Sequence, residues 1–550
     1  MWRASGVTAR HNIFLSVMTL FRIQPSISIM STQQFEMVAK TFQGLEEILA
    51  EELRSLGAQN VEPGRRMVSF EGDLAMLYRA NMCCRTALRI LKPIYKFIAH
   101  DPDSLYECIK EYDWTTVLSL DKTFSIDTVT NSDEFTHSRY VTYRVKDGIV
   151  DFFKDKLGPD CRPKVRLQDA DVMINVHIAG ERVTVSLDSS GESLHKRGYR
   201  VAQTEAPINE VLAAGIILQS GWRGDCPLVD PMCGSGTFLV EAALIAAGIM
   251  PGIYRKRFAF EAWPDFDPEL FESIYNDDSG ERTFNHKIYG GDISPKAVSI
   301  AQANIKSAGV AKYIDLQVKP LSQWNEAPEE DTPGVMITNP PYGERISTDD
   351  MDGLYAMIGS KLKHVFKGYH AWIIGYREEY FHKIGLAPSL KMQLLNGSLE
   401  CELREYIIFD GDYQSFRADG GSIKTEAGRP EKKASKRISD RQWSEEARRG
   451  GFGGKNARPK DGRGKPSRSD SPYRPTKGRF AKDGGRRDRF EPDANNEPNE
   501  NPLAQRRNEH ALKSLINRTP SLPPAGGVLM RPRRGWKRPS SPDQTDEKKD

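Results

Sequence analysis

The run PLVDPMCGSGTFLVEAALIAAG, at residues 227–248, constrains the fold more than any other part of the chain. A short apolar strand ends at Asp230, a glycine turn follows, and a long apolar helix begins near Thr237. A strand, a tight glycine turn and a helix in this order open a doubly wound α/β unit. Further strands, separated by helical segments, are predicted at KIYGGDI, IDLQV, GVMITN, AWIIG and LECELREYIIFD. This alternation predicts a Rossmann-like, mostly parallel sheet with an antiparallel last pair.

Two different regions flank this unit. Before it, residues 35–93 alternate strands with amphipathic helices, and residues 101–190 end in a predicted antiparallel hairpin across Gly180. Beyond residue 411 the apolar periodicity stops and Gly, Pro, Arg and Lys dominate, which is typical of disorder. We therefore expect an N-terminal extension (1–32), a first α+β segment (33–68), a second α+β domain (69–188), the α/β domain (189–412) and a disordered basic tail (413–550).

The net charge of +3 hides an asymmetry between the two ends of the chain. Residues 421–550 hold 33 Lys and Arg against 18 Asp and Glu, so this tail carries about +15 and the rest about −12. Such a tail would either bind RNA phosphates without sequence preference or be a solvated, dispensable appendage. The sequence leaves both interpretations open.

The seven cysteines are scattered and form no C-x-x-C pair, which argues against a disulfide framework and a zinc site. We expect a reduced, cytoplasmic location and no metal. The apolar run at residues 13–21 is about half the length of a membrane span, so no membrane association is expected. The first 35 residues lack acids and contain three arginines, as transit peptides do, but their amphipathic pattern is weak. A dispensable extension is therefore favoured over a targeting segment.

The glycine turn is the first candidate ligand site. It contains no Lys for a nucleotide triphosphate, and Leu239 replaces the third glycine of the dinucleotide fingerprint. A carboxylate beside the turn suits S-adenosylmethionine, whose ammonium group Asp230 could receive. Asp292, after the next predicted strand, could accept hydrogen bonds from the ribose hydroxyls. The predicted cofactor-binding residues are Asp230, Pro231, Cys233, Gly234, Gly236, Thr237, Asp292, Ile293 and Asn339.

The motif NPPY at residues 339–342 is the candidate catalytic segment. Pro340 and Pro341 end the strand VMIT, because they cannot donate to a ladder and their φ angles are fixed. The Asn339 amide oxygen and the Pro340 carbonyl are then two acceptors for the hydrogens of one planar amino group. Tyr342 offers a ring on which a base could stack. Asn339, Pro340 and Tyr342 are therefore the predicted catalytic residues.

Four basic residues ahead of the α/β unit are candidates for RNA contact. Arg139 and Lys146 lie on a predicted helix, and Lys196 and Arg197 lie in LHKRGYR. Solvated helix faces carry similar charges, so charge alone does not decide the assignment.

Three segments, DPMCGSGTFLVEAALIA, GGDISPKAV and NPPYGER, together resemble the class I S-adenosylmethionine-dependent methylases of exocyclic amines. LHKRGYR, EAPINEVLAAGI and RFAFEAWPDFD further resemble the bacterial large-subunit (23S) ribosomal RNA guanine-N2-methyltransferases, over about residues 35–410. The resemblance implies that a ferredoxin-like segment and a THUMP domain bind RNA ahead of the catalytic domain. It also implies that Asp230, Gly234 and Gly236 hold the methionine part of the cofactor. The sequence departs from the family at Pro320, where relatives often have an acid, so the adenine contact is unassigned.

We therefore predict a methyltransferase of the N2 amine of a guanine in 23S ribosomal RNA or a large-subunit precursor. A DNA adenine-N6 methyltransferase is the alternative enzyme, because NPPY recognises an amine without naming its base. A non-catalytic RNA-binding assembly factor is the alternative from another class. The absence of an evident DNA target-recognition domain disfavours the first alternative, and the intact Asp230, Asp292 and Asn339 disfavour the second.

Overall fold

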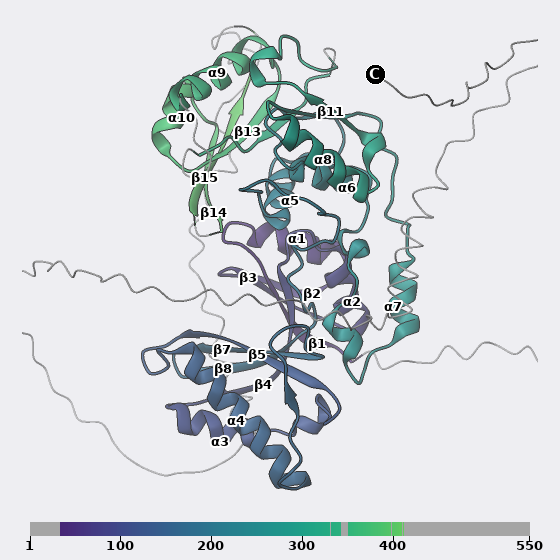
Figure 1. Cartoon of the computed structure of the whole chain (residues 1–550), viewed down its shortest axis with the longest axis vertical. Coiled ribbons are helices and arrows are strands. Elements are labelled where there is room, and N and C mark those ends of the chain that lie inside the picture. The colour runs from purple at the N-terminus through teal and green to yellow at the C-terminus, as the bar shows by residue number, and fades with distance from the viewer. Residues whose placement is uncertain (1–32, 330–331, 343–349, 398, 410, 412–550) are drawn as a thin grey trace, which may run out of the picture.

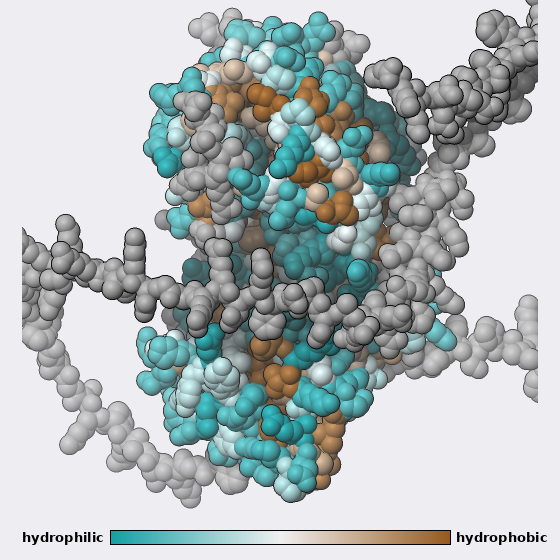
Figure 2. Space-filling view, in the orientation of Figure 1, coloured by the Kyte–Doolittle hydropathy of each residue, from teal (hydrophilic) through white to brown (hydrophobic). Residues whose placement is uncertain are grey.

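The computed structural model of the chain describes residues 33–411, apart from 330–331, 343–349, 398 and 410. The predicted extension (1–32) and tail (413–550) lie outside the described residues. Two units are stacked along the long axis, and each is built on one sheet (Figure 1). The surface in that view is largely hydrophilic, with apolar side chains gathered in smaller areas on both units (Figure 2).

The N-terminal unit is built on an eight-stranded sheet of order β2-β3-β1-β4-β8-β7-β5-β6. Its strands are β1 (Phe35–Lys40), β2 (Gln59–Gly64), β3 (Met67–Gly72), β4 (Arg89–Ile98), β5 (Thr123–Asn131), β6 (Lys164–Val165), β7 (Val172–Ala179) and β8 (Arg182–Asp188). Its helices are α1 (Glu46–Ser55), α2 (Leu74–Cys83), α3 (Pro102–Glu111), α4 (Ser138–Leu157) and the 3-10 turn η1 (Trp114–Thr116). The β7–β8 hairpin turns at Gly180, whose φ of 62° suits glycine, as the sequence predicts.

The two α+β regions expected from the sequence share this one sheet. β4 pairs with β1 on one side and with β8 on the other, so it joins the first region to the second. The division expected at residue 68 falls inside β3, which is paired with β1 along its whole length. A strand in the middle of a ladder cannot end a domain, so the ferredoxin-like part extends past α2 to β4.

The C-terminal unit, which we call the catalytic unit because it carries the predicted catalytic residues, contains a seven-stranded sheet of order β11-β10-β9-β12-β13-β15-β14. Its strands are β9 (Leu228–Asp230), β10 (Ile288–Asp292), β11 (Ile314–Val318), β12 (Val335–Thr338), β13 (His370–Gly375), β14 (Leu390–Asn396) and β15 (Leu399–Ile407). Its helices are α5 (Glu210–Gln219), α6 (Thr237–Ala246), α7 (Pro268–Tyr275), α8 (Pro295–Ser307), α9 (Met351–His364) and α10 (Glu378–Ile384), with 3-10 turns η2 (Pro251–Tyr254), η3 (Ala259–Ala262), η4 (Ala311–Tyr313) and η5 (Leu321–Gln323). β9 to β13 are parallel, and β15 runs antiparallel to both β13 and β14. The α/β class and the antiparallel end of the sheet are confirmed.

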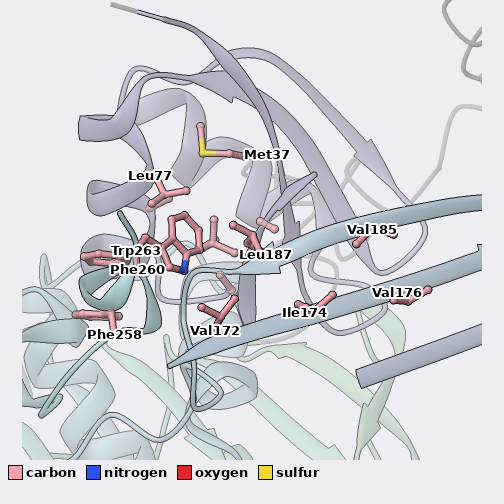
Figure 3. Close-up of a cluster of buried hydrophobic side chains, with 14 of the residues drawn as sticks. Met37, Leu77, Val172, Ile174, Val176, Val185, Leu187, Phe258, Phe260 and Trp263 are labelled. Atoms are coloured by element: carbon pink, nitrogen blue, oxygen red, sulfur yellow. The ribbon is translucent and has the colours of Figure 1, made fainter. Parts of the chain in front are cut away.

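An insertion after α6 joins the two units. Residues 251–275, which we call the strap, leave the catalytic unit and lie beside α2 of the N-terminal unit (Figure 1). Phe258, Phe260 and Trp263 of the strap are buried in one apolar cluster with Met37 and Leu77 (Figure 3). The Phe260 ring stacks on Tyr78 with 4.5 Å between centroids. The N-terminal core is therefore completed by side chains that the catalytic unit supplies.

Buried polar contacts reinforce the junction. Arg85, just after α2, donates from Nη2 to the carbonyls of Leu244 (3.2 Å) and Ile249 (2.8 Å), at the C-terminal end of α6. A cation at this helix end satisfies carbonyls that have no partner inside the helix and complements the helix dipole. Glu52 on α1 in turn accepts from the backbone N–H groups of Arg85 (2.8 Å) and Thr86 (3.0 Å). Burial raises the pKa of Glu52, and these hydrogen bonds oppose that rise.

Candidate active site

Three parallel strands end together at one edge of the catalytic sheet. β9 ends at Asp230, β10 ends at Asp292, and β12 ends at Thr338, directly before Asn339. Gly290 of β10 pairs with Asp230, so Asp292 extends two residues farther toward this edge. Open α/β sheets bind their ligands at the carboxyl ends of the strands. The structure thus brings together the three polar residues that the sequence selects.

Asp230 is a buried carboxyl with one oxygen committed to the protein. Its Oδ1 accepts from Thr338 Oγ1 (2.9 Å) and from the Met232 N–H (3.2 Å), which leaves Oδ2 for a ligand. Burial raises the pKa of Asp230 to about 7, against the lowering effect of these two hydrogen bonds, while Asp292 adds a small further rise. A cationic partner at Oδ2 would favour the ionised form, so this site suits an ammonium group.

The glycine turn is held against β10 by its own backbone. The Gly234 N–H donates to Asp292 Oδ2 (2.9 Å), and the Cys233 N–H donates to the Gly291 carbonyl (2.9 Å). Gly234 and Gly236 have φ angles of 54° and 78°, which residues with a Cβ atom rarely adopt. Pro231 and Cys233, also predicted to bind the cofactor, are buried in the turn, and their cofactor contact stays a prediction. Ser294 is the N-cap of α8, which leaves Asp292 free of that role, as the sequence predicts.

This edge fits S-adenosylmethionine in shape as well as charge. A Cβ built on Gly234 would meet nothing closer than Thr204 Oγ1 at 4.0 Å, so there is open space above the turn. Ile293 and Val318 follow or end neighbouring strands and are 74% and 51% exposed. Two exposed apolar side chains beside a buried acid suit a flat, apolar ring next to a ribose. Ile293 and Val318 are therefore the candidates for the adenine contact that the sequence left unassigned.

The NPPY segment has an unexpected internal contact. The Tyr342 hydroxyl donates to Asn339 Oδ1 at 2.5 Å, and Asn396 Nδ2 lies 3.5 Å from the same hydroxyl. Burial raises the pKa of Tyr342 well above its ordinary value, so the hydroxyl remains a donor at neutral pH. The Tyr342 ring is half-buried and faces the Tyr376 ring, with 6.4 Å between centroids. Stacking of Tyr342 on a base therefore stays a prediction, and the structure adds a second task, which is to orient the Asn339 amide.

Sequence reasoning missed a segment that borders the glycine turn. Arg200 donates from Nη1 to Ser235 Oγ (3.1 Å) and from Nη2 to Thr237 Oγ1 (2.9 Å), and it pairs with Glu210 (2.6 Å). The Thr237 hydroxyl thus accepts from Arg200, and the cofactor contact predicted for Thr237 stays a prediction. Asn304 of α8 also joins the segment to the turn, because it accepts from the Val201 N–H and donates to the Ser235 carbonyl. Arg200 is the last residue of LHKRGYR, and nothing in the composition of that motif indicates its position beside the turn.

The RNA candidates separate clearly in the structure. Arg197 is 2% exposed and its guanidinium lies 3.5 Å from buried Glu241, so its prediction as an RNA contact was wrong. The basic composition of LHKRGYR predicts an exposed loop, but the fold buries Arg197 at the junction of the two units. Arg139 is exposed, whereas Lys146 pairs with Asp147 (2.6 Å) and Lys196 pairs with Glu192 (2.5 Å).

A different basic group stands out in the N-terminal unit. The segment after α4, which is a loop apart from the two-residue strand β6 and is called the loop below, carries Arg162, Lys164 and Arg166. These three side chains are exposed and form no ion pair with another described residue. The neighbouring Leu167 is 87% exposed. By contrast, Arg144, Lys154 and Lys156 of α4 all pair with acids. Unpaired cations attract phosphates more strongly than neutralised ones, so the loop is the better candidate surface.

Within the described ranges, no helix is long and apolar enough to cross a bilayer. The same residues contain no group of three or more side chains of the kinds that bind metal ions.

The strand order, the glycine turn, the acid after β10 and NPPY after β12 define a class I S-adenosylmethionine-dependent methyltransferase. Residues 197–405 match the family described as "RMKL-like, methyltransferase domain", residues 36–91 match the "RlmL ferredoxin-like domain" and residues 99–188 match the "THUMP domain". The chain belongs to this RMKL-like methyltransferase family, and S-adenosylmethionine is its cofactor.

Two curated relatives cover most of the described residues. The ribosomal RNA large subunit methyltransferase K/L of Syntrophotalea carbinolica is 37% identical over 387 residues, which are 68% of this chain and 54% of that protein. The chain thus spans about half the length of this relative. A protein of Synechocystis named "Putative RNA methyltransferase slr0064" is 36% identical over 388 residues, which are 70% of this chain and all of that protein.

A solved structure shows the same fold with a ligand. The protein of the solved structure named "SMU.472, a putative methyltransferase complexed with SAH" is 31% identical, with a TM-score of 0.62 over 69% of this chain and all of that chain.

Proposed function

We propose that this protein transfers a methyl group from S-adenosylmethionine to the N2 amine of a guanine in 23S ribosomal RNA. The observation that carries the proposal is the position of Asn339 and Pro340 at the sheet edge, beside Asp230 and Asp292. The ferredoxin-like and THUMP matches, together with the names of the two curated relatives, support RNA as the substrate. The sequence resemblance supports guanine and its N2 atom.

The site can activate an amine without a metal ion or a covalent intermediate. An amide oxygen has two lone pairs, so Asn339 Oδ1 can accept from Tyr342 and from one amine hydrogen at the same time. The Pro340 carbonyl lies two residues beyond the end of β12 and can accept the second hydrogen. Two acceptors draw the amine nitrogen toward a tetrahedral geometry, which frees its lone pair for attack. When bound, the cofactor supplies a methyl group on a sulfonium, and the protein contributes mainly positioning.

The N-terminal unit would hold the RNA. Arg162, Lys164 and Arg166 supply phosphate contacts, and such contacts position the nucleic acid without reading its sequence. The strap and Arg85 keep this surface connected to the catalytic unit. The RNA would thereby be held by the N-terminal unit while its target base reaches the sheet edge of the catalytic unit.

The test is a methylation assay with labelled cofactor and separate ribosomal RNA, transfer RNA and DNA, followed by digestion to nucleosides. We expect labelled N2-methylguanosine from ribosomal RNA, and Asn339→Ala should abolish it while calorimetry shows that the cofactor still binds. Asn325→Ala is the matched control, because it removes the same side chain from an exposed position. Labelled N6-methyladenine in DNA, or normal activity of the Asn339 variant, would contradict the proposal.

A further inference from the structure

A pocket of about 630 Å³ lies at the same edge of the sheet as the NPPY segment. It is lined by Tyr376, Arg377, Glu379, Leu399 and Glu400. Tyr376 and Arg377 directly follow β13, which is parallel to β12 and therefore ends at the same edge as Asn339. Leu399 and Glu400 begin β15, where the antiparallel hairpin returns from that edge. A volume of this size is in the range that accommodates a compact organic ligand such as a nucleotide.

Contacts connect this pocket to the catalytic residues. The Tyr376 ring faces the Tyr342 ring, and the Tyr342 hydroxyl is bonded to Asn339. Asn396, which pairs with Leu399 in the hairpin, approaches the same hydroxyl. A base whose amine reaches Asn339 would therefore have its remaining edge close to this pocket.

The charged side chains of the pocket include both a hydrogen-bond donor and hydrogen-bond acceptors. Arg377 Nη1 lies 3.4 Å from Glu379 Oε1, which places a guanidinium donor beside one of the two acids. Glu400 is exposed, and its side chain makes no hydrogen bond or ion pair with another described residue. The pocket therefore offers a donor group and a carboxylate that is available as an acceptor.

We propose that this pocket receives the target base and selects guanine by its Watson–Crick edge, with Glu400 accepting from N1–H and Arg377 donating to O6. This inference rests on the proposed function. Among the common bases with an exocyclic amine, only guanine has an N–H next to that amine; adenine and cytosine have an unprotonated ring nitrogen there, which a carboxylate would repel. The protein thus offers two acceptors for the amine (Asn339 and Pro340), one acceptor for the ring N–H (Glu400) and one donor (Arg377). Among these bases, only guanine has the complementary order of groups along its Watson–Crick edge. Tyr376 and Leu399 supply the apolar surface that a flat base requires.

The experiment uses a short RNA that the full-length protein methylates, made with either guanine or 2-aminopurine at the mapped target. 2-Aminopurine keeps the reactive amine but lacks O6 and N1–H. We expect wild-type protein to prefer guanine by about tenfold to a hundredfold in kcat/KM. Glu400→Gln should reduce the rate on guanine and largely close this gap, because glutamine can donate to the bare ring nitrogen of 2-aminopurine. Arg377→Met should also narrow the gap, by loss of the O6 contact.

Glu378→Gln is the matched control. Glu378 lies next to Arg377 and Glu379 but pairs with Lys391 (3.4 Å) and Arg404 (3.2 Å), so the guanine preference should be unchanged. The pocket assignment is refuted if the Glu400 and Arg377 variants keep the wild-type ratio, or lose activity equally on both bases as a structural defect would. Its failure is separable from that of the proposed function, because the wild-type protein would still form N2-methylguanosine in ribosomal RNA and the Asn339 variant would still be inactive.

Discussion

The ionisation of Asp230 makes a quantitative prediction about cofactor binding. Its pKa of about 7 means that near pH 6.5 roughly three quarters of the unliganded protein carries a neutral carboxyl at this position. An ammonium group needs the ionised form. The apparent affinity for S-adenosylhomocysteine, which keeps the ammonium, should therefore rise about tenfold between pH 5 and pH 6, equivalent to about 1.4 kcal/mol, and level off above pH 7.

Calorimetry can observe the proton directly. Titrations at pH 6.5 in buffers of different ionisation enthalpy should show release of roughly 0.8 proton per ligand bound. Asp230→Asn is the control, because asparagine can still accept from Thr338 and Met232 but cannot ionise. It should bind more weakly and show no proton release from this position.

The raised pKa of Asp230 also affects the stability of the ligand-free protein. As the pH rises, this carboxyl strengthens ligand binding but lowers the free energy of unfolding. The folded-state pKa is raised above the unfolded value, so this carboxyl contributes fully to stability below about pH 4, and the contribution is lost as the pH rises to about 7. At pH 8 the buried charge costs up to about 4 kcal/mol, so Asp230→Asn should raise the free energy of unfolding of the ligand-free protein.

An affinity for S-adenosylhomocysteine that stays flat between pH 5 and pH 7 would refute the reasoning about Asp230. So would a proton release that persists in the asparagine variant.

Three further perturbations examine the junction and the RNA surface. Trp263→Ala should lower the free energy of unfolding by about 3–5 kcal/mol, measured by urea titration, because it empties the apolar cluster that the strap shares with the N-terminal unit; an unchanged midpoint would show that the strap is peripheral. Arg197→Met should cost about 3–5 kcal/mol in the same assay, because it leaves Glu241 buried without its cation, and a neutral effect would contradict that pairing. Alanine at the three unpaired cations of the loop after α4 should lower the salt dependence of RNA binding by about three phosphate contacts, whereas alanine at the acid-paired bases of α4 should change it little; equal effects would remove the loop from the interface.

The sheet edge was predictable because local signals there coincide with function. Gly234 and Gly236 mark the turn, and Pro340 and Pro341 stop β12 where the acceptors are needed. Each signal is a short-range constraint on the backbone, which a sequence displays directly.

Long-range pairing was not predictable in the same way. Nothing local shows that β4 joins two α+β regions into one sheet, since that depends on partners about 90 residues away. The burial of Arg197 was not predicted for the same reason, because its partner Glu241 lies on a helix 44 positions later. The Tyr342–Asn339 contact is local, but side-chain rotamers are set by packing against the β14–β15 hairpin.

The strap also sets an order of events during synthesis. Phe258, Phe260, Trp263 and Phe271 belong to the core of a unit whose sheet is complete at β8, about 70 residues earlier. Domains generally fold as they leave the ribosome, but this one emerges with part of its apolar interior still unmade. Until about residue 275 has been translated, its α2 face must remain open to solvent or to a chaperone. The N-terminal unit is thus first in the chain and cannot be the first to finish folding.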